Sequence, residues 1–169
     1  MALVIFQGPG GDNKFISEFT QRLDDCDLQS WDSEIKHSSK SAFYSLIKPN
    51  LKCEDYLKHL EQPLRYTLAS FRCSVHQLNI EQGRQTGIHV SQRLCNICNL
   101  GTIEDEIHFL FDCPVLADLR RNFLPKYCHT RPNVVNICRL FGSTDKKTIT
   151  CLAQYIRKAF EHRKEILSF

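Results

Sequence analysis

The chain has 169 residues, of which 42% are hydrophobic and 24% charged, so it is long enough to bury a core and does not have the composition of a disordered segment. No apolar run approaches the roughly 20 residues of a transmembrane helix, and no basic region precedes an apolar stretch at the N-terminus, so neither a membrane span nor a secretory signal is expected. The net charge of +3 is unevenly distributed, because residues 114–169 contain eleven basic and four acidic residues, which favours an anionic partner for the C-terminal third.

Residues 1–11 are expected to lie outside the folded domain. The stretch Phe6-Gln7-Gly8-Pro9 is similar to the picornaviral protease sites used in expression vectors, so the segment is interpreted as tag-derived, with a flexible native N-terminus as the alternative. In either case it does not contribute to the predicted fold.

The first helix is predicted directly after this segment. Asp12 can cap a helix that places Phe15, Phe19 and Leu23 on one face. The acidic stretch 24–27 is unfavourable at a helix C-terminus, so we predict that the helix ends there and a loop begins.

Two further helices are predicted before residue 64. One begins near Ser33, carries apolar residues up to Ile47 and is stopped by Pro49. The other is a short helix from Glu54 to Glu61, which ends before Pro63. Residues 12–63 are therefore predicted to form an N-terminal helical segment.

The strongest periodic signal follows, and it predicts a helix of about four turns. Its apolar residues recur at i, i+4, i+7, i+11 and i+14, namely at Leu64, Leu68, Phe71, Val75 and Leu78. Gly83 and Gly87 then break the pattern and predict a loop. Further on, Pro114 is placed to begin a helix, and two more helices are predicted over 134–141 and 148–167. No strand-like alternation longer than a few residues occurs, so the predicted fold class is mainly α.

Nine cysteines are too many to be incidental in a chain of this size. Their odd number and the lack of a secretory signal favour reduced thiols in an intracellular protein, nuclear or cytoplasmic, over a disulfide scaffold. The spacing C-x2-C-x9-H-x4-C supplies the thiolates and the imidazole that tetrahedral zinc requires, at Cys95, Cys98, His108 and Cys113. Because four protein ligands close the coordination sphere, we predict one structural Zn²⁺. It would lie in a small CCHC zinc knuckle, residues 93–113, inserted between the helices of a helical bundle that spans residues 64–169.

Other interpretations of these residues stay open. Cys95 and Cys98 can be ordinary buried thiols, whereas a thioredoxin-like redox pair would require a βαβ pattern that the sequence lacks. Cys128-His129 is a conceivable substitute ligand pair. The acidic residues 104–106 beside the site are interpreted as a solvated loop.

Three short motifs follow one another around the cysteines: Arg93-x-Cys95-x2-Cys98, then Glu104-Asp105-Glu106-x-His108-Phe109, then Cys113-Pro114 with Leu119-Arg120. Together they resemble the zinc-binding region at the C-terminus of non-LTR retrotransposon reverse transcriptases. The run from Phe71 to Arg84 is similar to the stretch that precedes this region in animal elements. The resemblance covers residues 64–125 well, and 30–63 and 126–165 more loosely.

The resemblance implies a nucleic-acid role, in which such a region holds template RNA or target DNA near a polymerase and a nuclease. The chain departs from the family pattern because it has no Tyr-x-Asp-Asp polymerase motif. It also has no convincing carboxylate cluster of the PD-(D/E)xK nuclease type, for which Glu161 to Lys164 is only a weak imitation. We therefore expect that the chain is not an enzyme.

Basic residues independently allow a track that binds phosphates. Arg65 and Arg72 share a face of the predicted helix 64–78, and Arg84 and Arg93 flank the loop that enters the knuckle. The predicted nucleic-acid contacts are Arg65, Arg72, Arg84, Arg93, Arg120, Arg121, Lys126 and Arg131.

Three aromatic side chains near these residues allow two roles each. Phe109 and Phe111 could stack on unpaired bases, but core positions are the preferred interpretation. His76 can be a satisfied, partly buried histidine, but the preferred interpretation is a polar structural residue that reaches the Arg84 loop through Glu81. Neither role is catalytic.

The predicted function is a zinc-stabilised module that binds RNA or DNA, mainly through backbone phosphates. The alternative is a non-catalytic protein–protein interaction module with a structural zinc. Its support is the acidic N-terminal half together with Trp31 and Tyr44, which could form a patch for a protein partner. Neither hypothesis includes a membrane or a small-molecule substrate as partner.

Overall fold

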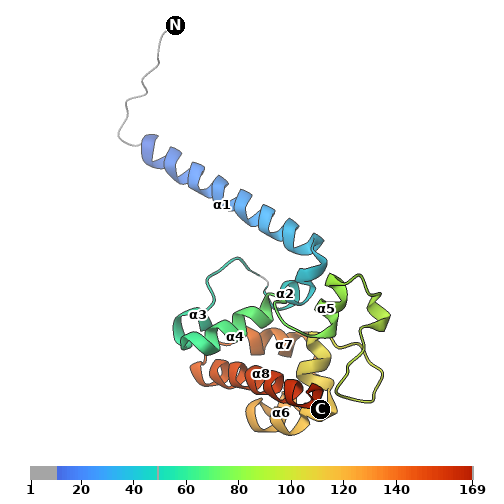
Figure 1. Cartoon of the computed structure of the whole chain (residues 1–169). Coiled ribbons are helices and arrows are strands. Elements are labelled where there is room, and N and C mark those ends of the chain that lie inside the picture. Colours follow the sequence, from blue (N-terminus) through green and yellow to red (C-terminus); the bar gives the residue numbers. More distant parts are fainter. Residues whose placement is uncertain (1–10, 49, 169) are drawn as a thin grey trace. The chain divides into compact units, whose positions relative to one another are not determined.

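The computed structural model describes residues 11–48 and 50–168, with side chains from Asn13 onward. It divides into two compact units, one up to Ser38 and one from Ser39 (Figure 1). The segment interpreted as tag-derived, residues 1–11, lies outside the described residues except for Gly11, which begins the first helix.

The first unit contains a single long helix, α1 (Gly11–His37). The loop predicted at residues 24–27 is wrong, because the helix continues through this stretch without a break. Charges oppose the helix dipole only in the terminal turns, and these acidic residues lie in the middle. No glycine or proline interrupts residues 12–37, and side-chain pairs four residues apart support the helix, such as Gln21 Nε2 to Asp25 Oδ1 at 3.0 Å.

The second unit begins with short helices. The 3-10 turn η1 (Ser39–Ser41) leads into α2 (Ala42–Ile47), which buries Phe43 and Ile47. The helix predicted from Ser33 is therefore split between α1 and α2, and Pro49, which was expected to stop it, lies outside the described residues. The short helix predicted over 54–61 is confirmed as α3 (Tyr56–His59).

The helix with the strongest sequence signal is shorter than predicted. Helix α4 (Gln62–Arg72) buries Leu68 and Phe71 but ends at Arg72. The chain then turns at Ser74, which has a positive φ of 53°, and Leu78 is buried from outside the helix while Val75 is 53% exposed. A second helix, α5 (Asn79–Gln85), occupies the place of the predicted loop and includes Gly83, whereas Gly87, with φ of 72°, lies in a turn as expected.

The remaining elements include three α-helices, of which α8 is the longest. A 3-10 turn, η2 (Val90–Gln92), leads to the knuckle, and the turns η3 (His108–Asp112) and η4 (Pro114–Leu116) lead from it to α6 (Ala117–Phe123). The turn η5 (Lys126–Cys128) precedes α7 (Val134–Phe141) and α8 (Lys146–Leu167). The predictions for residues 134–141 and 148–167 are thus confirmed to within two residues.

Helix α8 is the centre of the second unit. It packs against α4 and α6 (Figure 1). Its buried face includes Leu152, Tyr155 and Ile156. Helix α2 packs on α7, and α3 contacts α8. Because α2 and α3 belong to this core, the boundary between compact units lies after Ser38 and not between residues 63 and 64 as the sequence suggested.

The fold class is mainly α, as predicted. Within residues 11–48 and 50–168 there is no strand, and the only β-type pairing is an isolated antiparallel bridge between Leu94 and Ile103. None of the described helices combines the length and the apolar character needed to cross a bilayer.

Candidate metal centre

The first half of the site is a tight hairpin that begins after η2. The amide of Cys95 donates to the Thr102 carbonyl at 2.8 Å, and the amide of Glu104 donates to the Arg93 carbonyl at the same distance. Gly101 reverses the chain with φ of 63°, in the left-handed region that glycine adopts without steric cost. The hairpin therefore holds Cys95 and Cys98 close together.

The second half of the site is the π-helical turn η3, which separates His108 from Cys113. In an α-helix, positions five residues apart point about 140° away from each other. The wider turn brings them closer, and it is closed by the Cys113 amide, which donates to the His108 carbonyl at 2.7 Å. Asp105 Oδ1 accepts from the His108 amide at 2.7 Å and fixes the start of the turn.

The four predicted ligands come together in one buried cluster. The potential ligand atoms of Cys95, Cys98, His108 and Cys113 all lie within 4.8 Å of one another, and Cys98 Sγ is 3.4 Å from His108 Nε2. Around tetrahedral zinc, neighbouring sulfur and nitrogen ligand atoms lie about 3.5–4 Å apart. The geometry therefore fits a four-coordinate metal with no open position.

A hydrogen bond orients the imidazole for this role. His108 Nδ1 lies 3.1 Å from Thr102 Oγ1, while Nε2 faces the sulfur atoms. When Nδ1 carries the proton and donates it to Thr102, Nε2 presents its lone pair to a metal. Such outer-sphere partners commonly select the tautomer of metal-binding histidines.

The pKa of each thiol in the cluster depends on its neighbours and on burial. A hydrogen bond with Cys113, together with burial, raises the pKa of Cys95 to about 12, and the same hydrogen bond lowers the pKa of Cys113. Burial is the main cause that raises the pKa of Cys98. Three thiolates can therefore coexist here only if a cation compensates their charge, which is what a divalent metal supplies.

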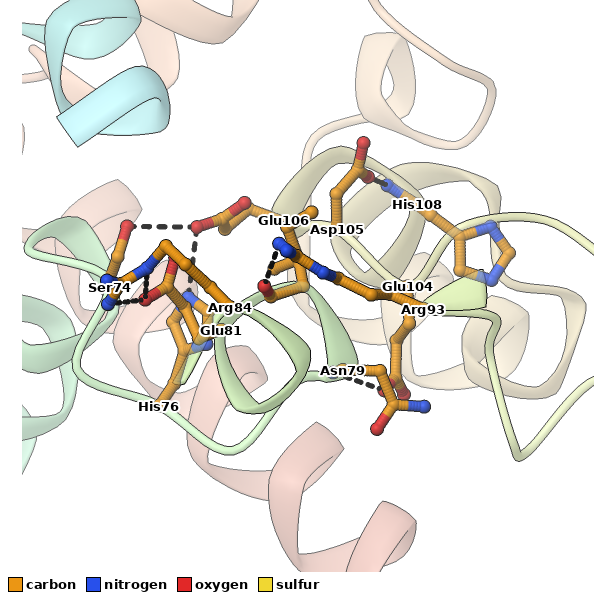
Figure 2. A network of polar contacts seen from close by, with 11 residues as sticks. Ser74, His76, Asn79, Glu81, Arg84, Arg93, Glu104, Asp105, Glu106 and His108 are labelled. Atoms are coloured by element: carbon orange, nitrogen blue, oxygen red, sulfur yellow. Dashed lines mark hydrogen bonds and ion pairs between the residues drawn. The ribbon is translucent and has the colours of Figure 1, made fainter. Parts of the chain in front are cut away.

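The acidic stretch beside the ligands is buried, so its interpretation as a solvated loop is wrong. Glu104 is 0% and Glu106 7% exposed. Figure 2 shows that Glu106 Oε1 accepts hydrogen bonds from Ser74 Oγ and His76 Nε2, both at 3.0 Å. His76 is thus a polar structural residue as expected, but its partner is Glu106 and not Glu81. Together these contacts fasten the segment before η3 to the turn that follows α4.

Glu104 connects the same segment to helices α8 and α5. Arg163 donates from Nε and Nη2 to the two carboxylate oxygens at 2.7 and 2.8 Å. The Asn79 amide at the start of α5 donates to Glu104 Oε2 at 2.9 Å. Both side chains of this ion pair are almost completely buried, and such a two-point contact fixes orientation as well as distance.

Arg93 supports the entry to the knuckle instead of facing solvent. Its Nη1 donates to the Ile80 carbonyl at 2.8 Å, and its Nε and Nη2 donate to the Ile88 carbonyl. The side chain crosses α5 directly over Gly83, where an added Cβ would lie 2.6 Å from Arg93 Cγ. This close approach explains a glycine inside the helix.

The Gly83→Ala variant is therefore expected to be destabilised by about 1–3 kcal/mol, although alanine has the higher helix propensity. The methyl group would displace an arginine that three hydrogen bonds hold in place. Thermal unfolding of this variant, beside the exposed control Gln85→Ala on the same helix, measures the effect. A Gly83→Ala variant as stable as the wild type would show that the close approach of the Arg93 side chain to Gly83 does not constrain residue 83.

The eight basic residues predicted to contact nucleic acid do not form one track. Arg72 and Arg120 are buried, and Arg120 donates to the carbonyls of Leu110 and Cys113, so neither can reach a phosphate in this fold. Three others are half-buried and bound to protein groups: Arg65, Arg84 and Arg93. The exposed members are Arg121, Lys126 and Arg131, of which Arg121 pairs with Asp118 and Arg131 with Asp112.

The remaining candidate residues lie in the core or beside it. Phe109 and Phe111 are 1% and 2% exposed, which confirms the core interpretation. Cys128 is buried, with its pKa raised to about 11 by burial, and His129 Nε2 lies 3.1 Å from the Leu124 carbonyl. Neither belongs to the cluster of four potential ligands.

The site includes two residues that the sequence did not indicate. Thr102 orients the imidazole, and Arg163 neutralises the buried Glu104, but neither has a local signal because their partners are brought to them by the fold. Comparison of the chain with protein-family models, with curated proteins and with solved structures gave no match.

Proposed function

We propose that Cys95, Cys98, His108 and Cys113 hold one Zn²⁺ and that the helical unit around them is a non-enzymatic module that binds RNA or DNA. Thiolate and imidazole ligands favour zinc among the common divalent metals, and the closed, buried cluster suits a structural ion. The nucleic-acid role rests on the resemblance of the motifs to the retrotransposon region and on the charge of the protein surface.

The observation that carries the nucleic-acid role is the exposed charge of residues 114–168. Nine of the eleven basic residues in this segment are exposed, against four exposed acidic residues. The exposed basic residues are Arg121, Lys126, Arg131, Arg139, Lys146, Lys147, Arg157, Lys158 and Lys164. This set replaces the predicted track, because it omits the arginines that serve the core, and its excess positive charge attracts phosphates.

Binding is expected to weaken as the salt concentration rises. For single strands the logarithm of the affinity falls with a slope of about −0.7 for each phosphate that is neutralised. Fluorescence anisotropy with labelled 20-nucleotide single strands and duplexes, of DNA and of RNA, between 25 and 200 mM salt measures this slope. An affinity that does not change with salt, or no binding at the lowest salt, would contradict the proposal.

The double variant Arg121→Glu/Lys158→Glu provides the matched test. Both side chains are exposed on helices that pack together, α6 and α8, so the substitutions should leave the fold intact. We expect binding at least about tenfold weaker and a shallower salt dependence. Lys40→Glu, an exposed substitution in η1 far along the chain from the basic segment, is the control and should bind as the wild type does.

A protein-interaction function is the second candidate, and the observation that favours it lies in α1. Four of its large apolar side chains are at least half exposed: Phe15, Ile16, Phe19 and Leu23. An exposed apolar stripe of this kind is typical of a surface that a partner covers. Trp31 also lies in this unit, but Tyr44 belongs to the second one. If the chain binds no nucleic acid, the relevant measurement compares the binding of a protein partner by the wild type and by the Phe19→Ser variant. The variant should lose the partner.

A further inference from the structure

A groove lies between helices α4 and α8, beside the hairpin of the metal centre. Its volume is about 650 Å³, within the range of small-molecule and nucleotide sites. Helix α4 contributes Tyr66 and Phe71, α8 contributes Phe160 and Lys164, and Asn96 comes from the knuckle between Cys95 and Cys98. The groove therefore lies between the metal centre and α8, the described helix with the most basic residues.

The groove is lined by three aromatic rings, of which Phe160 is the most exposed, and by two exposed side chains at its rim. The rings of Phe71, His76 and Phe160 lie in mutual contact, with centroids 5.3 to 6.2 Å apart. Tyr66 at the rim is 72% exposed, and Val75 on the same rim is 53% exposed. An exposed tyrosine beside an aromatic wall provides a surface on which a planar ring can stack.

Residues with unpaired polar groups line the same groove. His76 is held through Nε2 by Glu106, and its Nδ1 is buried without a hydrogen-bond partner among the described residues. Its side chain is only 3% exposed, and it lines the groove. The rim also contains the side-chain amides of Gln77, Gln82 and Asn96, which form no hydrogen bond with the described residues. Neutral amides can donate and accept, as the edges of nucleobases require.

The charge at one edge of the groove favours an anion. Lys164 is exposed and has no ion-pair partner among the described residues, and Arg157, seven residues earlier on the same face of α8, has only a 3.8 Å contact with Glu161. Arg163 contributes no free charge because Glu104 neutralises it. Two cations therefore stand at one edge of the groove beside a single carboxylate, that of Glu161, and the amides stand at the rim.

We infer that this groove binds an unstacked base of a single-stranded nucleic acid, with the adjoining phosphate at Lys164 and Arg157. The inference rests on the proposed function and names its substrate, a single strand with at least one base turned out of its stack. The base stacks against Tyr66 and the half-buried Phe160, and the amides contact its edge. A duplex, whose bases are paired and stacked, cannot fill the groove, and the metal centre contributes by holding Asn96 in place.

The test compares ten-nucleotide oligomers that carry equal numbers of phosphates with and without bases. The probes are oligothymidylate, oligouridylate and an abasic DNA of the same length, bound to the full chain at fixed salt. We expect the abasic strand to bind at least about fivefold more weakly than oligothymidylate, because each stacked base contributes to affinity. The Tyr66→Ala variant should lose the same factor for the strands with bases and none for the abasic strand.

Two lysine variants distinguish binding in the groove from attraction by the general surface charge. Lys164→Ala should weaken binding and reduce its salt dependence, whereas Lys146→Ala should have the smaller effect, since it removes the same charge about 27 Å away at the other end of α8. Equal affinities for the strands with and without bases would overturn the groove inference and leave the proposed function standing. No binding of any oligomer would overturn both.

Discussion

The Cys98→Ser variant is expected to lose its metal and to unfold at least residues 90–125. A serine hydroxyl does not replace a thiolate ligand of zinc, and structural zinc contributes about 10–16 kcal/mol in small domains. This exceeds or equals the total stability of most domains, so little of the surrounding structure should survive. Metal content by mass spectrometry and amide hydrogen exchange over residues 90–125 measure the two effects.

The matched control for this substitution is Cys73→Ser. Cys73 is exposed and lies outside the cluster of four potential ligands, so the same change of sulfur to oxygen should leave metal content and melting temperature unchanged. A Cys98→Ser protein that retains metal and melts as the wild type does would show that Cys98 is not a ligand and would contradict the closed four-ligand site.

The Glu104→Gln variant is expected to lower the free energy of unfolding by about 3–5 kcal/mol. Arg163 is 6% exposed and loses its only carboxylate partner among the described residues, so its charge would stay buried without compensation. Chemical denaturation followed by circular dichroism measures the loss. The exposed Glu165→Gln change on α8 serves as control and should cost no more than about 0.5 kcal/mol.

A double variant distinguishes the ion pair from other effects at Glu104. In Glu104→Gln/Arg163→Gln the uncompensated charge is absent, so the loss should be smaller than the sum of the two single losses. Additive losses, or a Glu104→Gln variant as stable as the wild type, would show that the buried pair does not fasten the knuckle to α8.

The Cys3His cluster was the part of this molecule that could be predicted best from the sequence. Its ligands are close together in the chain, and each belongs to a residue type with few other reasons to occur at that spacing, so Cys95, Cys98, His108 and Cys113 could be assigned from spacing alone. Short apolar helices with clear ends, such as α7, were also predictable for the same local reasons.

The charged residues were the part that local patterns could not determine. Glu104 and Arg163 read as surface residues in sequence, and they are 59 positions apart, so their pairing depends on how α8 packs beside the knuckle. In the same way Arg72 and Arg120 satisfy carbonyl groups in the core, among them the Phe141 carbonyl far along the chain. The apolar periodicity also predicted a helix that continues past Arg72, where α4 ends. Leu78 fits the periodic pattern, but it is buried from a position after the turn that follows α4, outside the helix.

The most direct measurement of the central claim is the native mass of the purified wild-type chain, before and after treatment with a strong chelator. The Cys3His cluster should give one zinc ion per chain, and its removal should abolish cooperative thermal unfolding of the second unit. A chain that contains no metal as purified, takes up none when zinc is supplied, and still unfolds cooperatively would contradict the metal centre and the function proposed on it.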